Sequence, residues 1–135
     1  MTSSVSYSQD KKLKLSILPN LLSVCQLKSD SKIPGWTQKS SFFCVTRTSD
    51  ELSLVCDQSI VPSDIKRVDN WRAFKVLGPL DFSQIGIIAS ISKCLADNKI
   101  SIFAISTYDT DYFLVENKNF EAARKVLTDN FTIDD

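Results

Sequence analysis

The chain has 135 residues, of which 43% are hydrophobic and 24% are charged, a composition ordinary for one or two small folded domains. Sixteen basic residues balance sixteen acidic ones, which argues against a protein that recruits nucleic acid through a basic face. The chain contains no histidine, so catalytic pairs of histidine with serine or cysteine are excluded, together with the commonest metal ligand. We therefore expect no metal and no other cofactor.

The start of the chain and its cysteines indicate the cellular compartment. Residues 1–11 are polar, without a basic start or an apolar core, and we interpret them as a flexible tail, not a secretory signal. No apolar run approaches the length needed to cross a bilayer. The cysteines, which lie in apolar stretches without metal-site spacing, are Cys25, Cys44, Cys56 and Cys94. This pattern favours buried free thiols, and we expect a cytoplasmic protein without membrane contact.

The first half of the chain predicts mainly strands. Two apolar runs, Leu13–Leu18 and Leu21–Leu27, predict strands that are separated by a Pro-Asn break. The next stretch, residues 28–35, ends in a Pro-Gly pair and cannot form a long regular helix. Residues 41–56 predict a hairpin. We therefore expect short turns in this half where the second half has helices.

In the second half, a strand is predicted at Trp71–Leu77, followed by a helix that Asp81 or Ser83 caps. Apolar residues recur in this helix every three or four positions, which predicts one buried face. The residues of that face are Ile85, Ile88, Ile91 and Leu95.

Two further strands are predicted at Ile100–Thr107 and Asp111–Glu116, with turn residues between them. A second helix follows, capped by Asn117 or Asn119, and Phe131–Ile133 forms a closing strand. The apolar residues of this helix are Phe120, Ala123, Val126 and Leu127. The order strand-helix-strand-strand-helix-strand is that of a ferredoxin-like α+β domain.

The first middle strand of this domain is apolar on both faces. Ile102 and Ala104 point to one face, and Phe103 and Ile105 point to the other. In this topology both helices cover one face, so a sister domain or a second chain is expected to cover the other. Leaving such side chains in water would cost about 25 cal/mol per Å². We therefore expect domain pairing or a homodimer.

The first half contains a faint copy of the second, displaced by sixty positions. Residues 41–56 align with residues 101–116 without a gap, and both segments predict hairpins that turn at the same point. The copy lacks the helices. We expect a flexible tail at residues 1–11, a degenerate unit at residues 12–69 and a full unit at residues 70–135.

Two groups of segments carry a resemblance to a known family. In the second half they are Gly78–Phe82, Gly86 and Ser101–Val115. In the first half they are Leu15–Pro19, Trp36 and Phe42–Arg47. Together they resemble the ACT family, and in particular small tandem ACT proteins whose units also occur in aspartate kinase regulatory regions and in animal cytosolic arginine sensors. The resemblance implies two ferredoxin-like ACT units, no intrinsic catalysis, and an effector site at an interface between units.

The residues themselves favour an amino-acid site in the second unit. The Gly78–Phe82 loop leads into a helix whose first amide groups are unpaired and attract a carboxylate. Gly86 lets a ligand or another backbone come close, and Asp109 and Asp111 can bind an ammonium group. The complete set of candidate ligand-binding residues is Leu80, Asp81, Phe82, Ile85, Gly86, Thr107, Tyr108, Asp109 and Asp111.

Structural explanations of these residues remain open. Asp109 and Thr110 are also ordinary turn residues, and Gly86 can serve the packing of a helix on a strand. In the first unit Arg47 replaces Thr107, and no helix start is available. This difference leaves a second, equivalent site in doubt.

Three other functions compete with amino-acid binding. An RNA-binding module needs basic residues beside exposed aromatic ones, and no Lys or Arg occurs in residues 100–116. A hydrolase of the acylphosphatase kind needs a phosphate cradle with several glycines, and the chain has three in total. The third is a structural protein that pairs with itself or with a regulated enzyme without binding a ligand. We favour a non-catalytic regulatory protein that binds an amino acid, forms a homodimer and acts on a regulated enzyme.

Overall fold

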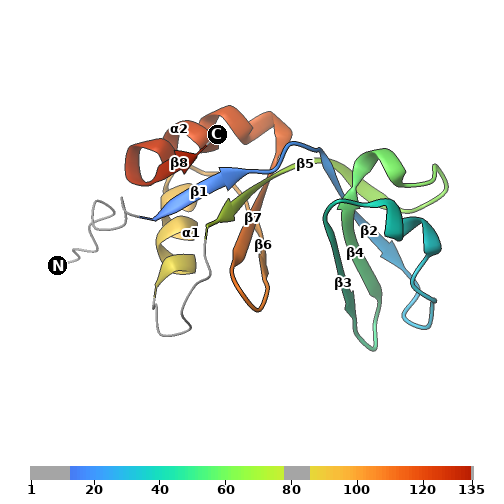
Figure 1. Ribbon diagram of the computed structural model, residues 1–135. Coiled ribbons are helices and arrows are strands. Elements are labelled where there is room, and N and C mark those ends of the chain that lie inside the picture. Colours follow the sequence, from blue (N-terminus) through green and yellow to red (C-terminus); the bar gives the residue numbers. More distant parts are fainter. Residues whose placement is uncertain (1–12, 78–85, 135) are drawn as a thin grey trace. The chain divides into compact units, whose positions relative to one another are not determined.

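A computed structural model describes residues 13–77 and 86–134 of the chain. The chain divides into two compact units (Figure 1). One, here called the full unit, combines the chain up to Leu18 with the chain from Arg72 onward, and the other, the reduced unit, is Pro19–Trp71. Both are ferredoxin-like, and the expected α+β class is confirmed. The reduced unit has short 3-10 turns in its connections instead of long helices.

The reduced unit is built on an antiparallel sheet with the strand order β3-β4-β2-β5. Its strands are β2 (Leu22–Leu27), β3 (Phe43–Arg47), β4 (Leu52–Asp57) and the first part of β5 (Arg67–Val76). The 3-10 turns are η2 (Gly35–Lys39) and η3 (Gln58–Ile60). Alternate apolar residues of β2 and β4 form its core, which contains Cys25, Leu52, Leu54 and Cys56.

The full unit has the sheet order β6-β7-β5-β1-β8. Its strands, besides the end of β5, are β1 (Lys14–Ile17), β6 (Phe103–Ser106), β7 (Asp111–Glu116) and β8 (Thr132–Asp134). Its helices are α1 (Ile87–Asp97) and α2 (Phe120–Asn130), and the 3-10 turn η4 (Asn117–Asn119) precedes α2. Both helices pack on one face of the sheet, around buried residues such as Phe74, Leu95, Phe113 and Leu127.

Strand β1 lies between β5 and β8, antiparallel to the first and parallel to the second. The sequence predicted this strand but assigned it to the degenerate unit at residues 12–69, whereas it belongs to the sheet of the full unit. The physical reason is the burial of Leu15, which is fully enclosed in the same core as Phe74 and Phe131. The other division, between Trp71 and Arg72, falls close to the expected boundary.

Helix α1 begins at Ile87, later than a cap at Asp81 or Ser83 would place it, and its N-cap residue is Gly86. Its apolar stripe recurs at positions i, i+4, i+7 and i+8 and faces the sheet. The members of the stripe are Ile87, Ile91, Cys94 and Leu95. Ile88 is 42% exposed, so its predicted place on the buried face is wrong.

The remaining elements lie close to their predicted positions. Helix α2 buries Phe120, Ala123 and Leu127, as its periodicity predicted. Its N-cap is Asn119, one of the two expected residues, but the Asn119 side chain makes no capping hydrogen bond. Strand β5 begins at Arg67, ahead of the predicted start, because its first part pairs with β2.

The cysteines are free thiols, and three of them, Cys25, Cys56 and Cys94, are buried. Burial raises the pKa of the Cys44 and Cys94 thiols, because a thiolate would lose its hydration there. The pKa of Cys56 is raised by its hydrogen bond to Cys25 and, in addition, by burial. These raised pKa values keep the thiols of Cys44, Cys56 and Cys94 protonated at neutral pH, which argues against a nucleophilic role for them. The pKa of Cys25 is instead lowered by its hydrogen bond with Cys56.

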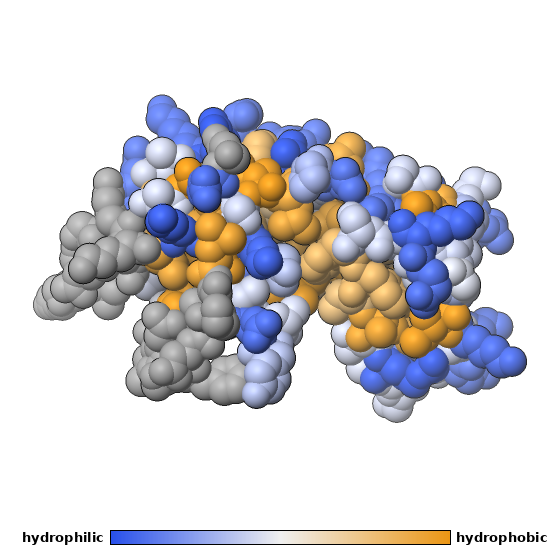
Figure 2. Space-filling view, in the orientation of Figure 1, coloured by the Kyte–Doolittle hydropathy of each residue, from blue (hydrophilic) through white to orange (hydrophobic). Residues whose placement is uncertain are grey.

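The two faces of β6 differ in what covers them. Ala104 pairs in register with Phe113, which lies in the core beneath the helices, so Phe103 and Ile105 point to the opposite sheet face. On that face Phe103 is half-buried and Ile105 is only 7% exposed. The expected cover of that face by a sister unit or a second chain stays a prediction. Elsewhere, apolar residues reach the surface among hydrophilic ones (Figure 2). Among the described residues, the large exposed apolar ones are Ile33, Val45, Val68, Ile88 and Tyr108.

Candidate functional site

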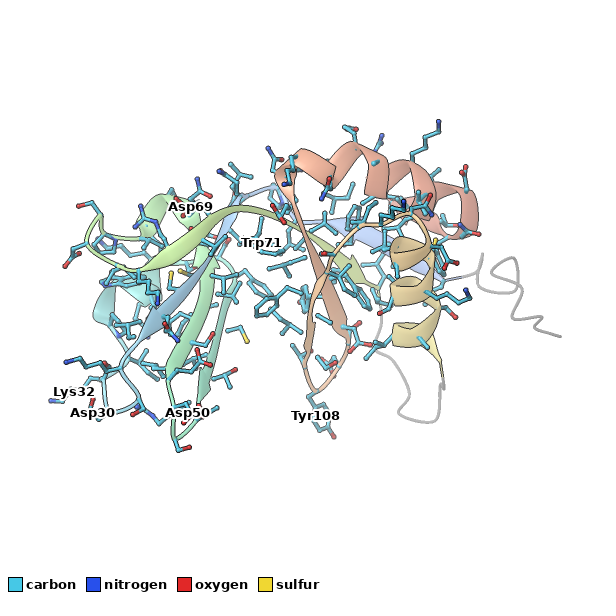
Figure 3. The ribbon with its side chains drawn as sticks, turned by 180° about the vertical axis from the view of Figure 1, so that it is seen from behind. Asp30, Lys32, Asp50, Asp69, Trp71 and Tyr108 are labelled. Atoms are coloured by element: carbon cyan, nitrogen blue, oxygen red, sulfur yellow. The ribbon has the colours of Figure 1, made fainter. Side chains whose placement is uncertain are left out.

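The candidate site of the full unit centres on the turn between β6 and β7. The Thr107 amide donates to the Thr110 carbonyl at 2.8 Å, and the Thr110 amide donates to the Thr107 hydroxyl at 3.2 Å. Tyr108 stands at the tip of the hairpin and is 85% exposed (Figure 3). Asp109 is exposed as well. The hydrogen bonds of the turn therefore explain why a threonine stands at position 107, while Tyr108 and Asp109 point into solvent.

Thr110 ties this turn to the neighbouring strand. Its side chain is buried, and its hydroxyl donates to the Val76 carbonyl at 2.5 Å. Val76 is the last residue of β5, before the chain continues toward α1. The bond holds the β6–β7 turn against the end of β5. The sequence indicated Thr110 only as a turn residue, because turn propensity does not show which hydroxyl is buried.

We expect Thr110→Val to lower the free energy of unfolding by roughly 1–2 kcal/mol, because the Val76 carbonyl loses a donor in a buried environment. Valine has nearly the shape of threonine, so the loss reports the hydrogen bond. Urea denaturation followed by circular dichroism measures it. Thr110→Ser keeps the hydroxyl and should retain most of the stability; equal losses in the two variants would contradict this role.

Asp111 is the first residue of β7 and pairs in register with Ser106 of β6. Its side chain is half-buried. Within residues 13–77 and 86–134 the Asp111 carboxylate makes no hydrogen bond or ion pair. Partial burial strengthens the attraction between a carboxylate without a partner and any cation that reaches it. Asp111 can therefore bind an ammonium group.

Helix α1 starts at the same end of the full unit as the β6–β7 turn (Figure 1). Its first helical bond runs from the Ser90 amide to the Gly86 carbonyl at 2.7 Å, so the amides of Ile87 and Ile88 precede it. Among the described residues no side chain caps this end, and the first turn carries no acidic residue. An uncapped helix start is positive and attracts carboxylates.

Gly86 itself is explained by its backbone. Its φ is 88°, in the left-handed region that side chains disfavour. A methyl group at this position would meet no described atom within 4 Å. The conformation, and not a close approach of the sheet to the helix, therefore accounts for the glycine.

Of the nine predicted site residues, Leu80, Asp81, Phe82 and Ile85 lie outside the described residues. The structure brings four others together on or directly after the β6–β7 turn, and α1, whose N-cap is Gly86, starts at the same end of the full unit. Those four are Thr107, Tyr108, Asp109 and Asp111. Their role in ligand binding stays a prediction.

Metal and membrane features were sought in the same part of the chain. Between residues 13 and 77 and between 86 and 134, no group of three or more His, Cys, Asp or Glu residues could hold a metal ion. Over those two ranges, no helix has the length and apolar character needed to cross a membrane.

Comparison with known families gives two adjacent matches. The ACT domain model matches residues 66–129, and a model of an N-terminal domain matches residues 21–64. The human protein CASTOR3P is 32% identical over 145 residues, covering 96% of this chain and 88% of that protein. The bovine cytosolic arginine sensor for mTORC1 subunit 1 is 33% identical over 102 residues, covering 70% of this chain. The match spans only 31% of that sensor's own length.

Solved structures show the same fold. A crystal structure of a protein from Agobacterium tumefaciens is 34% identical, with a TM-score of 0.84 over 90% of this chain and 91% of that one. The regulatory subunit of aspartate kinase from Thermus thermophilus has a TM-score of 0.60 over 87% of this chain and 97% of that one. At 9% identity the second likeness shows the fold alone. The chain is a member of the ACT-domain family.

Proposed function

We propose that this protein is a non-catalytic regulatory protein that binds a free amino acid in its full unit. The observation that carries the proposal is the half-buried Asp111 carboxylate, which has no partner among the described residues. It lies at the end of the unit where α1 begins with uncapped amides. An amino acid complements both features, because its ammonium group can bind Asp111 and its carboxylate can bind the helix start. The relatives named as an arginine sensor and as a regulatory subunit support the same class of function.

We propose that the protein forms a homodimer, resides in the cytoplasm and changes the activity of a regulated enzyme. The regulatory subunit of aspartate kinase, as that relative is named, supports an enzyme as the partner.

Thermal-shift measurements with each of the twenty amino acids at millimolar concentration test the binding. A ligand at one hundred times its dissociation constant adds about 2.7 kcal/mol of stability. For a chain of this size that corresponds to a rise in Tm of roughly 5–10 °C. We expect one amino acid, or a closely related group, to produce such a rise.

Asp111→Ala should abolish the rise while leaving the Tm of the ligand-free protein within a few degrees, because its side chain has no described partner to lose. Asp129→Ala, which removes an exposed carboxylate from α2, is the matched control and should keep the full response. If no amino acid raises the Tm of the natural protein, the result favours the alternative function, a structural protein that pairs with itself or with an enzyme without binding a ligand. An undiminished rise in Asp111→Ala would place the site elsewhere.

A further inference from the structure

The reduced unit contains an open groove of about 540 Å³ at the end of β2. Its volume lies within the range of small-molecule sites. The groove is lined by Gln26, Leu27, Lys28, Ser31, Asp50, Asp64, Ile65 and Lys66. All of these residues belong to the reduced unit, so the groove is separate from the proposed amino-acid site.

Three segments that are neighbours in the sheet form this groove: the β3–β4 turn, the end of β2 and the segment that enters β5. Leu27 of β2 pairs with Leu52 of β4, so the β3–β4 turn that carries Asp50 lies beyond that pair on one side (Figure 3). On the other side the Gln26 amide donates to the Lys66 carbonyl at 3.0 Å, which places the segment entering β5 next to β2. Lys28, directly after β2, stands between the two walls.

Hydrogen bonds to backbone carbonyls hold the groove in shape. The Ser31 amide donates to the Lys28 carbonyl at 3.0 Å and closes the turn after β2. The Arg47 guanidinium donates to the Ser29 carbonyl and, at 2.7 Å, to the Ser31 carbonyl. Because the groove is already ordered, binding of a ligand costs less conformational entropy.

The groove also carries four charged side chains that are free to interact with a ligand. They are Lys28, Lys66, Asp50 and Asp64. All four are exposed, and none of these side chains forms an ion pair or hydrogen bond with the part of the chain that the structure describes. Leu27 and Ile65, both half-buried, provide apolar surface between them.

We propose that this groove binds a short zwitterionic peptide of about three residues. Asp50 on one wall binds the ammonium group, and Lys66 on the other wall, together with Lys28, binds the carboxylate. Neighbouring strands lie roughly 4.8 Å apart, so two spacings put the walls roughly 10 Å apart. An extended chain spans roughly 3.3–3.6 Å per residue, so three residues reach both walls and a single amino acid does not.

Titration of the 15N-labelled full chain with tri-alanine tests this assignment. We expect saturable shifts of the amide signals of residues 26–28, 50 and 64–66. N-acetyl-tri-alanine lacks the ammonium group, tri-alanine amide lacks the carboxylate, and L-alanine is too short; each should bind at least tenfold more weakly. Absence of shifts with tri-alanine, or equal binding of L-alanine, would overturn the proposal.

Variants of exposed residues then identify the groups that bind. Lys66→Ala and Asp50→Ala should each raise the dissociation constant for tri-alanine at least tenfold. Lys39→Ala removes an exposed lysine of the same unit outside the groove and should leave the dissociation constant unchanged. Equal affinity in all three variants would show that the charges of the groove take no part.

The same spectra separate this proposal from the proposed function. Binding of an amino acid in the full unit shifts the amides of residues 107–111, whereas binding in the groove shifts those of the reduced unit. Shifts at residues 107–111 alone, with either ligand, would uphold the amino-acid site and refute the peptide groove. Shifts at the groove alone would do the reverse.

Discussion

Phe113→Ala should lower the free energy of unfolding by about 3–5 kcal/mol, the largest loss that we expect from a single substitution in this chain. Phe113 is fully buried on β7, in the core that both helices share with Phe74. Truncation removes the apolar contacts of the ring and leaves a cavity that close-packed neighbours fill only in part. Since small domains are stable by only about 5–15 kcal/mol, the full unit loses a large share of its stability.

Urea denaturation of the two proteins measures this loss as a shift of the midpoint. Ile33→Ala is the control, because Ile33 is 46% exposed in a connection of the reduced unit and its truncation should change stability by less than about 0.5 kcal/mol. A loss below about 1 kcal/mol in Phe113→Ala would contradict its position in the core.

Asp69→Ala should destabilise the protein by about 2–3 kcal/mol through a different cause, the loss of a polar network in the reduced unit. The Ser23 hydroxyl, which is fully buried, donates to the Asp69 carboxylate at 2.6 Å. The Arg67 Nε lies 2.9 Å from the same oxygen, but that ion pair is partly exposed and contributes less. Most of the cost therefore arises from the Ser23 hydroxyl, which the substitution leaves buried without an acceptor.

Removal of that hydroxyl tests the explanation. Ser23→Ala alone should cost less than Asp69→Ala, because Asp69 keeps Arg67 as a partner. The double variant has no Ser23 hydroxyl left without an acceptor. Its loss of unfolding free energy should therefore be about 1 kcal/mol smaller than the sum of the losses in the two single variants. A double-mutant cycle measures this difference. Strictly additive losses would show that the hydrogen bond contributes nothing to stability.

Most of the fold could be predicted from periodic apolar patterns. The spacing of Phe120, Ala123 and Leu127 predicted the buried face of α2, and the alternating residues of 41–56 predicted the β3–β4 hairpin. These patterns are local, so they do not state which sheet a strand joins. For this reason β1 was expected in the wrong unit, although its own residues were recognised as a strand.

The start of α1 shows a second limit of local patterns. Asp81 and Ser83 suit a helix cap, and Ile88 continues the spacing of Ile91 and Leu95. The backbone instead reaches the helix through Gly86 at positive φ, which shifts the start to Ile87 and turns Ile88 outward. A glycine before an apolar run signals such a conformation only when the φ angle is known.

The sequence could predict which residues belong to the candidate site, but it could not predict the contacts that they make. Asp111 was chosen because an aspartate is unusual at the start of a strand, and the structure adds its partial burial. The bond from Thr110 to Val76 joins residues far apart in the sequence, and no motif announced it. The charged groove of the reduced unit was missed for the same reason, because its lining residues come from three separate segments.

The position of β1 has a consequence for the order in which the chain can fold during synthesis. Lys14 pairs with Thr132, so a strand near the beginning of the chain waits for the last strand before its pairing is complete. At 5–20 residues per second the ribosome takes roughly 6–24 seconds to make the intervening chain. During that interval Leu15 has no complete sheet to join, while the reduced unit already has all of its strands. The reduced unit is therefore expected to fold first on the ribosome, and the full unit only once β8 has been made.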